Sequence, residues 1–168
     1  LGANYSAFAI NSLNVGVVGD FAEGRNLEKE IIEGNKAYTG SEVIDFLTQV
    51  CTQFLEPLHN GGVVHKDIKP QNIIVNSDKE YTLIDFGTIR SVNDLATMTI
   101  TMRGTPGYSR IKSKHEVSDD FYSLAKTAYF LFTGRHPEFI GHDEYDRMED
   151  EKKFNALRID ENLKRVLW

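Results

Sequence analysis

The sequence predicts an α+β fold in which short strands come first and helices make up most of the remaining chain. Residues typical of β-strands dominate segments 5–10 and 15–21, on either side of the turn-forming stretch 11–14. Several later segments repeat their apolar residues at helical spacing instead. We therefore expect a β-hairpin near the N-terminus, followed by a mainly helical body.

Two helices are expected after this hairpin. Asn26 is a candidate N-cap for a short helix over 27–33, and Ser41 is a candidate N-cap for a longer helix that Gly61 and Gly62 end. The longer helix has an apolar face at helical spacing. This face consists of Val43, Ile44, Leu47, Val50, Cys51, Phe54, Leu55 and Leu58. We expect it to be buried, including the thiol of Cys51.

The second half of the chain is predicted to be mostly helical. Segment 88–108 has little periodicity, whereas 124–132 is apolar on nearly all sides. Such a helix is expected to be enclosed by others, and Gly134 is expected to end it. Polar helices are predicted over 143–156 and 160–168.

A second hairpin is predicted in the middle of the chain. Residues 73–76 form a short apolar segment, 77–80 contain turn residues, and 81–84 form a returning strand. A hairpin with four residues in each strand would place Asn72 beside Asp85. Two oxygen donors would then converge on one point.

Four polar side chains next to this hairpin suit the transfer of a phosphoryl group. Asp67 can accept a proton, Lys69 is a cation, and Asn72 and Asp85 are hard oxygen ligands. Mg²⁺ typically takes one or two protein oxygens and fills its other positions with water and nucleotide phosphates. We therefore expect a metal–nucleotide site and not a closed metal cage.

The segments that carry these residues resemble the catalytic core of the eukaryotic-type (Hanks-type) Ser/Thr protein kinases. HKDIKPQN at 65–72 is similar to the H-R-D-x-x-x-x-N catalytic loop, and DFG at 85–87 to the D-F-G motif. GTPGY at 104–108 resembles the end of an activation segment. DDFYSL at 119–124 resembles the start of the central helix of the large lobe, and DFAEGRNL at 20–27 resembles the hinge. The resemblance covers nearly the whole chain.

The resemblance implies one protein-kinase-like domain over 1–168, with a mainly helical C-terminal lobe and remnant strands of the N-terminal lobe. Residues 1–21 would supply those strands, and 22–168 the hinge and large lobe, incomplete at the C-terminus. No G-x-G-x-x-G loop and no V-A-I-K-like strand is present. Either the missing part precedes Leu1, or it was cut or disordered, or the protein is naturally reduced; the first two explanations are favoured. A further segment or a partner would complete the small lobe.

The resemblance also implies roles for the polar residues. Asp67 would orient the acceptor hydroxyl and take its proton, and Lys69 would steady the transferring phosphoryl group. Asn72 and Asp85 would hold Mg²⁺, or Mn²⁺, against the phosphates of ATP. Thr105 lies where the family places a hydroxyl near the catalytic Asp and Lys. A Lys at position 69 and this hydroxyl mark the Ser/Thr class.

Other positions are expected to bind adenine or to support the loop. Asp20 and Ala22 match hinge positions whose backbone groups bind adenine, and Ile74 would form part of the floor below it. His65 is expected to pack under the Phe of the DFG motif. Asp120 is expected to accept backbone N–H groups of the catalytic loop.

The chain departs from the family pattern at two further places. Lys66 replaces the Arg that commonly grips a phosphate on the activation segment, and Lys offers only a point charge. Thr97, Thr99 and Thr101 are therefore either a weakened switch or ordinary loop residues. The sequence SRI at 109–111 replaces the A-P-E motif, so the segment would be less rigid or anchored differently.

We therefore predict a Ser/Thr protein kinase that transfers the γ-phosphate of ATP to a protein hydroxyl. One alternative is a pseudokinase-like binding module, which the absent phosphate-binding Lys favours and the four intact polar residues oppose. A small-molecule kinase is disfavoured by Thr105 and the GTPGY segment, which form a peptide-binding shelf in protein kinases.

Composition agrees with one globular domain of 168 residues, 40% hydrophobic and 26% charged. The net charge of −6 argues against nucleic acid as the main partner. Cys51 is the one cysteine, which excludes an internal disulfide and fits a reducing, cytoplasmic location. No apolar run approaches the ~20 residues of a membrane span.

Overall fold

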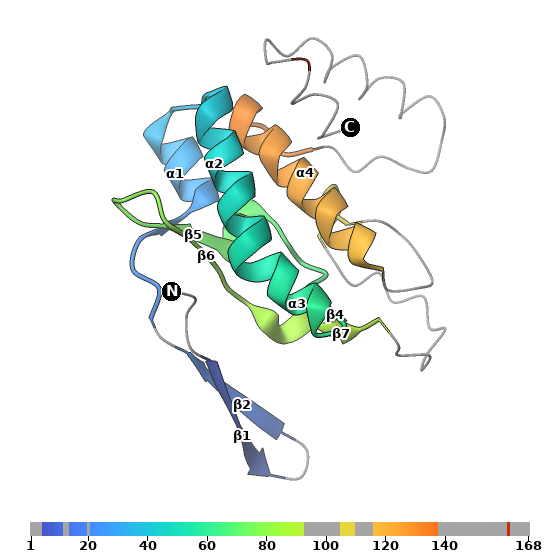
Figure 1. Ribbon diagram of the computed structural model, residues 1–168. Coiled ribbons are helices and arrows are strands. Elements are labelled where there is room, and N and C mark those ends of the chain that lie inside the picture. The colour runs from blue at the N-terminus through green and yellow to red at the C-terminus, as the bar shows by residue number, and fades with distance from the viewer. Residues whose placement is uncertain are drawn as a thin grey trace.

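The computed structural model describes residues 5–11, 14–19, 21–92, 105–109, 116–137 and 161, the first two ranges by their backbone. Strands β1 (Tyr5–Asn11) and β2 (Asn14–Gly19) pair antiparallel and form the predicted N-terminal hairpin (Figure 1). Their register pairs Tyr5 with Gly19, so β2 ends two residues before the predicted boundary at residue 21.

Helix α1 (Leu27–Gly34) begins where the sequence predicts. The side chain of Asn26 accepts a hydrogen bond from the backbone N–H of Lys29 at 2.9 Å, which satisfies one of the open donors of the first turn. Asn26 also ends the short strand β3 (Arg25–Asn26), which pairs with β5 (Ile73–Val75). The chain therefore passes directly from the small central sheet into α1.

Helix α2 (Gly40–Val50) begins after Thr39, so the prediction of Ser41 as its N-cap is wrong. Thr39 and Glu42 form a capping box, in which the Thr39 N–H donates to Glu42 Oε2 at 2.8 Å and the Glu42 N–H donates to Thr39 Oγ1 at 3.4 Å. A capping box requires a carboxylate three residues after the cap. The residue three positions after Thr39 is Glu42, which is a carboxylate, whereas the residue three positions after Ser41 is Ile44, which is not.

The long predicted helix is interrupted by one π-helical turn. After α2, the turn Cys51–Leu55 leads into α3 (Glu56–Asn60), and Gly62, with φ 72°, follows. A π-turn has a wider spacing than an α-helix and changes which residues face the core. Before this turn, within α2 itself, Ile44 is 49% exposed, which corrects its prediction as a core residue, whereas Phe46 is fully buried. Cys51 is half-buried and not fully enclosed.

The central hairpin has the predicted strands, but its register differs by one residue. Strand β5 pairs with β6 (Tyr81–Leu83), and Ile73 lies opposite Leu83. The turn is shorter than predicted because the Asn76 N–H donates to the Glu80 carbonyl at 3.1 Å and Lys79 is left-handed, with φ 61°. A three-residue loop ending in a left-handed residue is a common hairpin connection. Asn72 is therefore opposite Ile84, and not opposite Asp85 as predicted.

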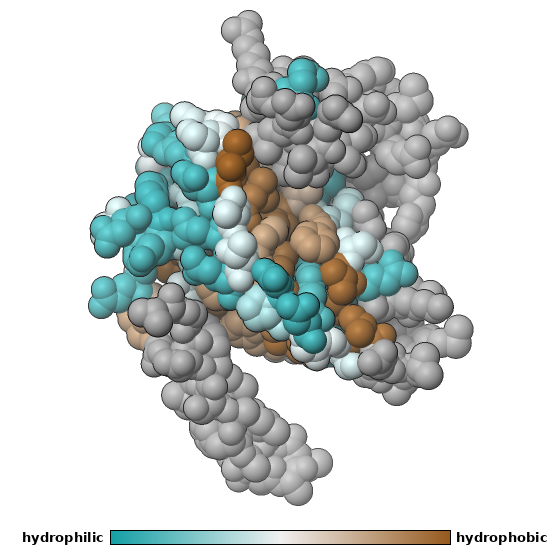
Figure 2. Space-filling model, viewed as in Figure 1, coloured by the Kyte–Doolittle hydropathy of each residue, from teal (hydrophilic) through white to brown (hydrophobic). Residues whose placement is uncertain are grey.

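Helix α4 (Val117–Thr133) lies beside α2 (Figure 1). Helix α2 packs on β6 of the small sheet formed by β3, β5 and β6, and α4 packs against β4 (Val63–Val64). Gly134 ends α4 in a left-handed conformation, as predicted, and its N–H donates to the Phe130 carbonyl at 2.8 Å. Figure 2 shows a hydrophobic strip along the seam between α2 and α4, flanked by hydrophilic side chains of α1 and the β5–β6 turn. The core beneath includes Leu27, Val43, Phe46, Val50, Leu55, Ile68, Ile73, Leu83, Leu124, Phe130 and Leu131.

Several predictions fall outside the described residues. These are the helix over 143–156, most of the helix over 160–168, and the contributions of Asp20 and of the threonines at 97, 99 and 101. Within the last predicted helix, Glu161 is described and is helical. No helix among the described residues is long and apolar enough to cross a membrane.

Replacing Gly24 with alanine is expected to destabilise the fold. Gly24 has φ 130°, and a Cβ atom built on it would lie 2.2 Å from the Val75 carbonyl oxygen. Both the conformation and the close approach require glycine. We expect the free energy of unfolding to fall by at least about 2 kcal/mol in urea titrations. Gly40→Ala is the control, because its Cβ meets open space; an equal loss there would contradict this account.

Candidate active site

The segment that contains the predicted catalytic loop and the D-F-G motif begins and ends at a small two-stranded sheet. Strand β4 (Val63–Val64) pairs with β7 (Arg90–Ser91), which brings together the two ends of the segment between them. Within this segment the Thr88 hydroxyl donates to the His65 carbonyl at 2.7 Å. The loop that carries Asp67 is therefore closed into a compact unit by its own backbone.

Asp120, in the first turn of α4, accepts hydrogen bonds from the backbone of the catalytic loop, as predicted. Its carboxylate accepts the backbone N–H of His65 at 2.8 Å and that of Lys66 at 2.9 Å. His59 Nε2, at the end of α3, lies 2.9 Å from the same carboxylate. Asp120 is fully buried. A buried carboxylate is stable only with such partners, so three segments are joined at this one side chain.

His65 packs against Phe86, which confirms the predicted structural role. The two rings meet edge to face with centroids 5.2 Å apart. Burial lowers the pKa of His65, although the carboxylates of Asp120, Asp67 and Asp85 act in the opposite direction. The neutral ring accepts the Asp67 N–H on Nδ1 at 3.4 Å. His65 therefore contacts the D-F-G segment and orients the backbone of Asp67.

Asp67, Lys69 and Thr105 form a closed ring of hydrogen bonds. Lys69 Nζ donates to Asp67 Oδ2 at 2.8 Å and to Thr105 Oγ1 at 2.7 Å, and the Thr105 hydroxyl donates to Asp67 Oδ1 at 2.9 Å. The structure thus places Thr105 beside Asp67 and Lys69, although they are 38 and 36 residues apart. The ring fixes a carboxylate, an ammonium group and a hydroxyl within one small volume.

The neighbours of Asp67 hold its carboxyl in the ionised form. Burial by itself raises the pKa of Asp67, but hydrogen bonds from Lys69, Thr105 and Asn72 and the charge of Lys69 outweigh burial, so the pKa lies below its usual range. Asp67 is 7% exposed. A carboxylate that is ionised at neutral pH and within reach of a hydroxyl can act as a proton acceptor.

Replacing Lys69 with methionine is expected to move the acidic limb of the pH–rate profile to higher pH. Without the ammonium group, burial of Asp67 is less opposed, so the pKa of its carboxyl rises. The ionised base is then present only above that higher pKa, and the rate is lost earlier as pH falls. The measurement is kcat/KM against pH. An unchanged acidic limb would contradict the assignment of this limb to Asp67.

Asn72 is also fixed by Asp67. Its amide nitrogen donates to the Asp67 carbonyl at 2.8 Å and to Asp67 Oδ2 at 3.0 Å. Both amide hydrogens are thereby used, and no described residue donates to the amide oxygen. Asn72 is buried. Its oxygen therefore has the chemistry and the fixed orientation of a metal ligand.

Ile84 pairs with Asn72, because its N–H donates to the Asn72 carbonyl at 2.9 Å, and Asp85 is the next residue along the chain. Asp85 has φ 65°, and its carboxylate is exposed and accepts the Gly87 N–H at 3.4 Å. No contact between the Asp85 and Asn72 side chains is present among the described residues, so their predicted convergence stays a prediction. The described part of the chain contains no cluster of three or more His, Cys, Asp or Glu suited to a metal ion.

The predicted adenine contacts are described in part. Ile74 lies in β5 opposite Thr82 and is half-buried, and Ala22 is half-buried in the link that precedes β3. Asp20 lies outside the described residues. Adenine binding by these residues stays a prediction.

The segment after Thr105 is anchored through contacts that the sequence did not predict. Tyr108 is buried, and its hydroxyl lies 2.9 Å from His136 Nδ1. A Cβ atom on Gly107, which has φ 85°, would lie 2.4 Å from the Pro137 carbonyl oxygen. The residues that follow α4 thus hold this segment by close backbone packing and a side-chain contact.

Two further residues join this anchor to the catalytic loop. His136 Nε2 lies 3.1 Å from Glu28 Oε1 in α1, and the same oxygen accepts a hydrogen bond from Gln71. Burial, followed by the charge of Glu28, raises the pKa of Tyr108. No signal in the single sequence indicates these contacts, because they join α1, the catalytic loop and the residues after α4 only through packing.

The closed loop, the segment that begins at Thr105 and the ionised carboxylate of Asp67 lie together on an α+β fold. A model of the protein kinase domain family matches residues 4–166. This match covers nearly the whole chain, so the chain belongs to the protein kinase domain family. Proteins of this family use ATP and Mg²⁺ and act on protein substrates.

Relatives that match the chain include serine/threonine kinases from bacteria and animals. It is 32% identical over 128 residues to the probable serine/threonine-protein kinase PknB of Corynebacterium glutamicum, covering 72% of this chain and 20% of that protein. It is 34% identical over 132 residues to serine/threonine-protein kinase PknA of Nostoc sp., covering 73% of this chain and 23% of that protein. A putative ribosomal protein S6 kinase alpha-1 of Caenorhabditis elegans is 31% identical over 137 residues, covering 77% of this chain and 17% of that protein.

These matches confirm the predicted kinase-like α+β fold and the Ser/Thr protein kinase class. The chain spans about a fifth of the length of the relatives that it matches. What the whole protein phosphorylates, and with which partners, is therefore a matter of proposal.

Proposed function

We propose that the protein containing this chain transfers the γ-phosphoryl group of Mg²⁺–ATP to serine or threonine hydroxyls of protein substrates. The observation that carries the proposal is the hydrogen-bonded ring of Asp67, Lys69 and Thr105. It presents an ionised carboxylate and a cation side by side, which are the two groups that an acceptor hydroxyl and a transferring phosphoryl group require.

In the proposed reaction, Asp67 accepts the hydrogen bond of the substrate hydroxyl in place of that from Thr105. The substrate oxygen forms a bond to the γ-phosphorus while the bond from that phosphorus to the β–γ bridging oxygen breaks. The hydroxyl proton passes to Asp67, and ADP leaves. Lys69 remains near both groups and balances the negative charge on the phosphoryl oxygens.

The residues present fit a nucleotide-bound Mg²⁺. Asn72 offers an amide oxygen to which no described residue donates, and Asp85 offers an exposed carboxylate. A set of one or two protein oxygens is typical of Mg²⁺ sites that also bind phosphates. Bound Mg²⁺ would neutralise phosphate charge during transfer. Asn72 and Asp85 would hold this ion, with Ala22, Ile74 and Asp20 close to the adenine.

Thr105 and the segment after it supply the support for a protein substrate. Tyr108 and Gly107 fix the segment against the residues that follow α4, while its first residue, Thr105, contacts Asp67. An extended peptide that rests on this segment would bring its hydroxyl to the catalytic carboxylate. This arrangement favours a protein substrate over a small molecule. The half-buried thiol of Cys51 fits a reducing compartment such as the cytoplasm.

The proposal is tested with the intact protein, radiolabelled [γ-³²P]ATP and a mixture of peptides that contain Ser, Thr or Tyr. We expect label on Ser and Thr peptides, loss of labelling when EDTA removes Mg²⁺, and strongly reduced labelling for Asp85→Asn. Binding of Mg²⁺–ATP without transfer to any peptide would identify a binding module and contradict the proposal. Label on sugars or antibiotics alone would identify a small-molecule kinase and would also contradict it.

A further inference from the structure

Lys66, which directly precedes the proposed catalytic base, has its charge neutralised inside the fold. Its ammonium group lies 2.8 Å from Asp119 Oδ2, and the two side chains are 9% and 4% exposed. Asp119 is in the first turn of α4, 53 residues along the chain from Lys66. An ammonium group with so little exposed surface and a carboxylate partner is not open to a phosphate on another segment.

The backbone of Lys66 is held by the neighbouring acid. Lys66 has φ 71°, in the left-handed region that is uncommon for residues with a side chain. Its N–H donates to Asp120 Oδ1 at 2.9 Å. Adjacent carboxylates of α4 thus fix both parts of residue 66, Asp120 its backbone and Asp119 its side chain. The left-handed conformation of Lys66 turns the chain sharply. The contacts of Lys66 with Asp119 and Asp120 therefore set the orientation of the next residue, Asp67.

Asp119 is itself well fixed. Its carboxylate accepts the Glu116 N–H at 3.1 Å as part of the capping box that begins α4. The carboxylate is therefore fixed to the first turn of α4 and moves only with this helix. An ion pair anchored in this way provides a rigid counter-charge at the base of the catalytic loop.

We propose that the Lys66–Asp119 ion pair positions Asp67 and makes phosphoryl transfer independent of a phosphate on the segment that contains Thr97, Thr99 and Thr101. This inference rests on the proposed kinase activity. Lys66 and Asp119 are positioning residues, since neither contacts the reacting atoms. Removal of one charge leaves the other buried and unpaired, which is strongly unfavourable, whereas replacement of both by neutral groups is tolerated.

The first test compares intact wild-type protein with Lys66→Met, Asp119→Asn and the double variant. We expect kcat to fall at least about tenfold in each single variant while the KM for ATP changes less than about twofold. The double variant is expected to regain kcat to within about threefold of wild type, and Lys66→Arg to retain it, because no unpaired charge remains. Wild-type kcat in both single variants, or a double variant as slow as the slower single variant, would overturn the proposal.

The second test leaves Lys66 and Asp119 unchanged and therefore applies even if a single variant at these positions fails to fold. The Thr97→Ala, Thr99→Ala, Thr101→Ala triple variant and phosphatase-treated wild type are compared with untreated wild type. We expect kcat within about twofold in both cases, since Asp119 already supplies the negative charge at Lys66. A loss of about tenfold or more would overturn the proposal.

A readout without catalysis separates this inference from the proposed function. If wild type labels no peptide, the proposed function fails, but amide hydrogen exchange over residues 65–72 still reports on the ion pair. We expect faster exchange in each single variant and near wild-type exchange in the double variant. Equal exchange in all four proteins would show that the pair does not order the loop.

Discussion

Replacing Asp67 with asparagine is expected to reduce kcat by about 10²–10⁴-fold while leaving Mg²⁺–ATP affinity within a few-fold of wild type. Asparagine cannot accept the proton of the substrate hydroxyl. Its amide group also replaces an acceptor that Lys69 and Asn72 both contact, at 2.8 Å and 3.0 Å. The measurement is steady-state phosphorylation of a Ser/Thr peptide by the intact protein, with nucleotide affinity measured by calorimetry.

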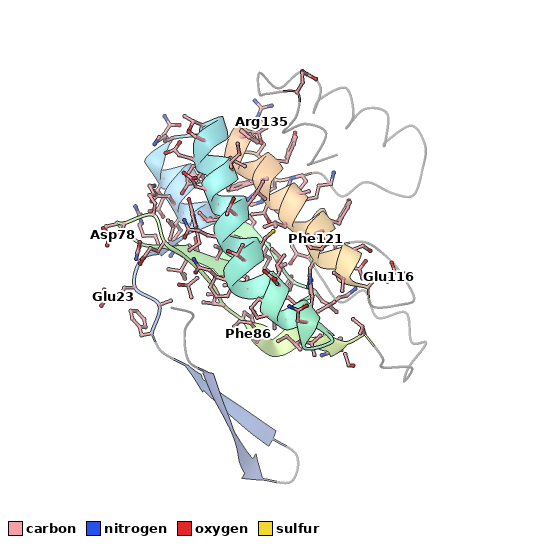
Figure 3. All side chains as sticks on the ribbon, viewed as in Figure 1. Glu23, Asp78, Phe86, Glu116, Phe121 and Arg135 are labelled. Atoms are coloured by element: carbon pink, nitrogen blue, oxygen red, sulfur yellow. The ribbon has the colours of Figure 1, made fainter. Side chains whose placement is uncertain are left out.

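The matched control for this substitution is Asp78→Asn. Asp78 is exposed in the β5–β6 turn, and Figure 3 shows it at the tip of that turn, apart from Phe86 of the D-F-G segment. The control should retain wild-type kcat. Residual transfer by Asp67→Asn at more than about a tenth of the wild-type rate would show that Asp67 is not the principal proton acceptor.

Replacing Asp120 with alanine is expected to lower the free energy of unfolding by about 3–5 kcal/mol. The substitution leaves the buried N–H groups of His65 and Lys66 and the ring of His59 without their acceptor. Each buried group left unpaired has a desolvation cost that water cannot offset. Urea unfolding followed by circular dichroism measures the change.

Asp45→Ala provides the comparison for Asp120→Ala, because Asp45 is exposed on α2. It is expected to change the free energy of unfolding by less than about 0.5 kcal/mol. The account of Asp120 as the point that joins α3, α4 and the catalytic loop would be contradicted by a loss below about 1 kcal/mol in Asp120→Ala. Figure 3 shows Glu116 and Phe121, which flank this site in sequence, at the same end of α4.

Local sequence signals predicted those parts of the fold that depend on neighbouring residues. Asn26 caps α1 and Gly134 ends α4 because a cap depends on residues within one turn. The cap of α2 was mispredicted because Ser41 is a good cap type, but Thr39 has the carboxylate partner at the required spacing. Residue type alone was insufficient; the reciprocal hydrogen bond decided the position.

The register of the central hairpin could not be fixed from strand composition. It depends on the left-handed conformation of Lys79, which shortens the loop by one residue and pairs Asn72 with Ile84. Lysine gives little indication of this conformation, since glycine and asparagine are its usual occupants. A shift of one residue changes which side chains share a face, so the position of Asp85 is the part of the site that the sequence predicted least well.

The catalytic loop was predicted well as a motif and incompletely as a structure. The closeness of Thr105 to Asp67 and the role of Asp120 followed from the family resemblance and are seen in the hydrogen bonds. The burial of Lys66 against Asp119 was not predicted, because the two residues come together only through the packing of α4 under the loop. Long-range ion pairs of this kind have no signature in a single sequence.

The central claim is that Asn72 and Asp85 hold one magnesium ion beside Asp67. A crystal structure of the intact protein with Mg²⁺ and a non-hydrolysable ATP analogue tests it most directly. We predict one cation at about 2.1 Å from both Asn72 Oδ1 and an Asp85 carboxylate oxygen, bridged to the nucleotide phosphates. A bound nucleotide whose cation touches neither residue, with Asp85 still accepting the Gly87 N–H, would contradict the account.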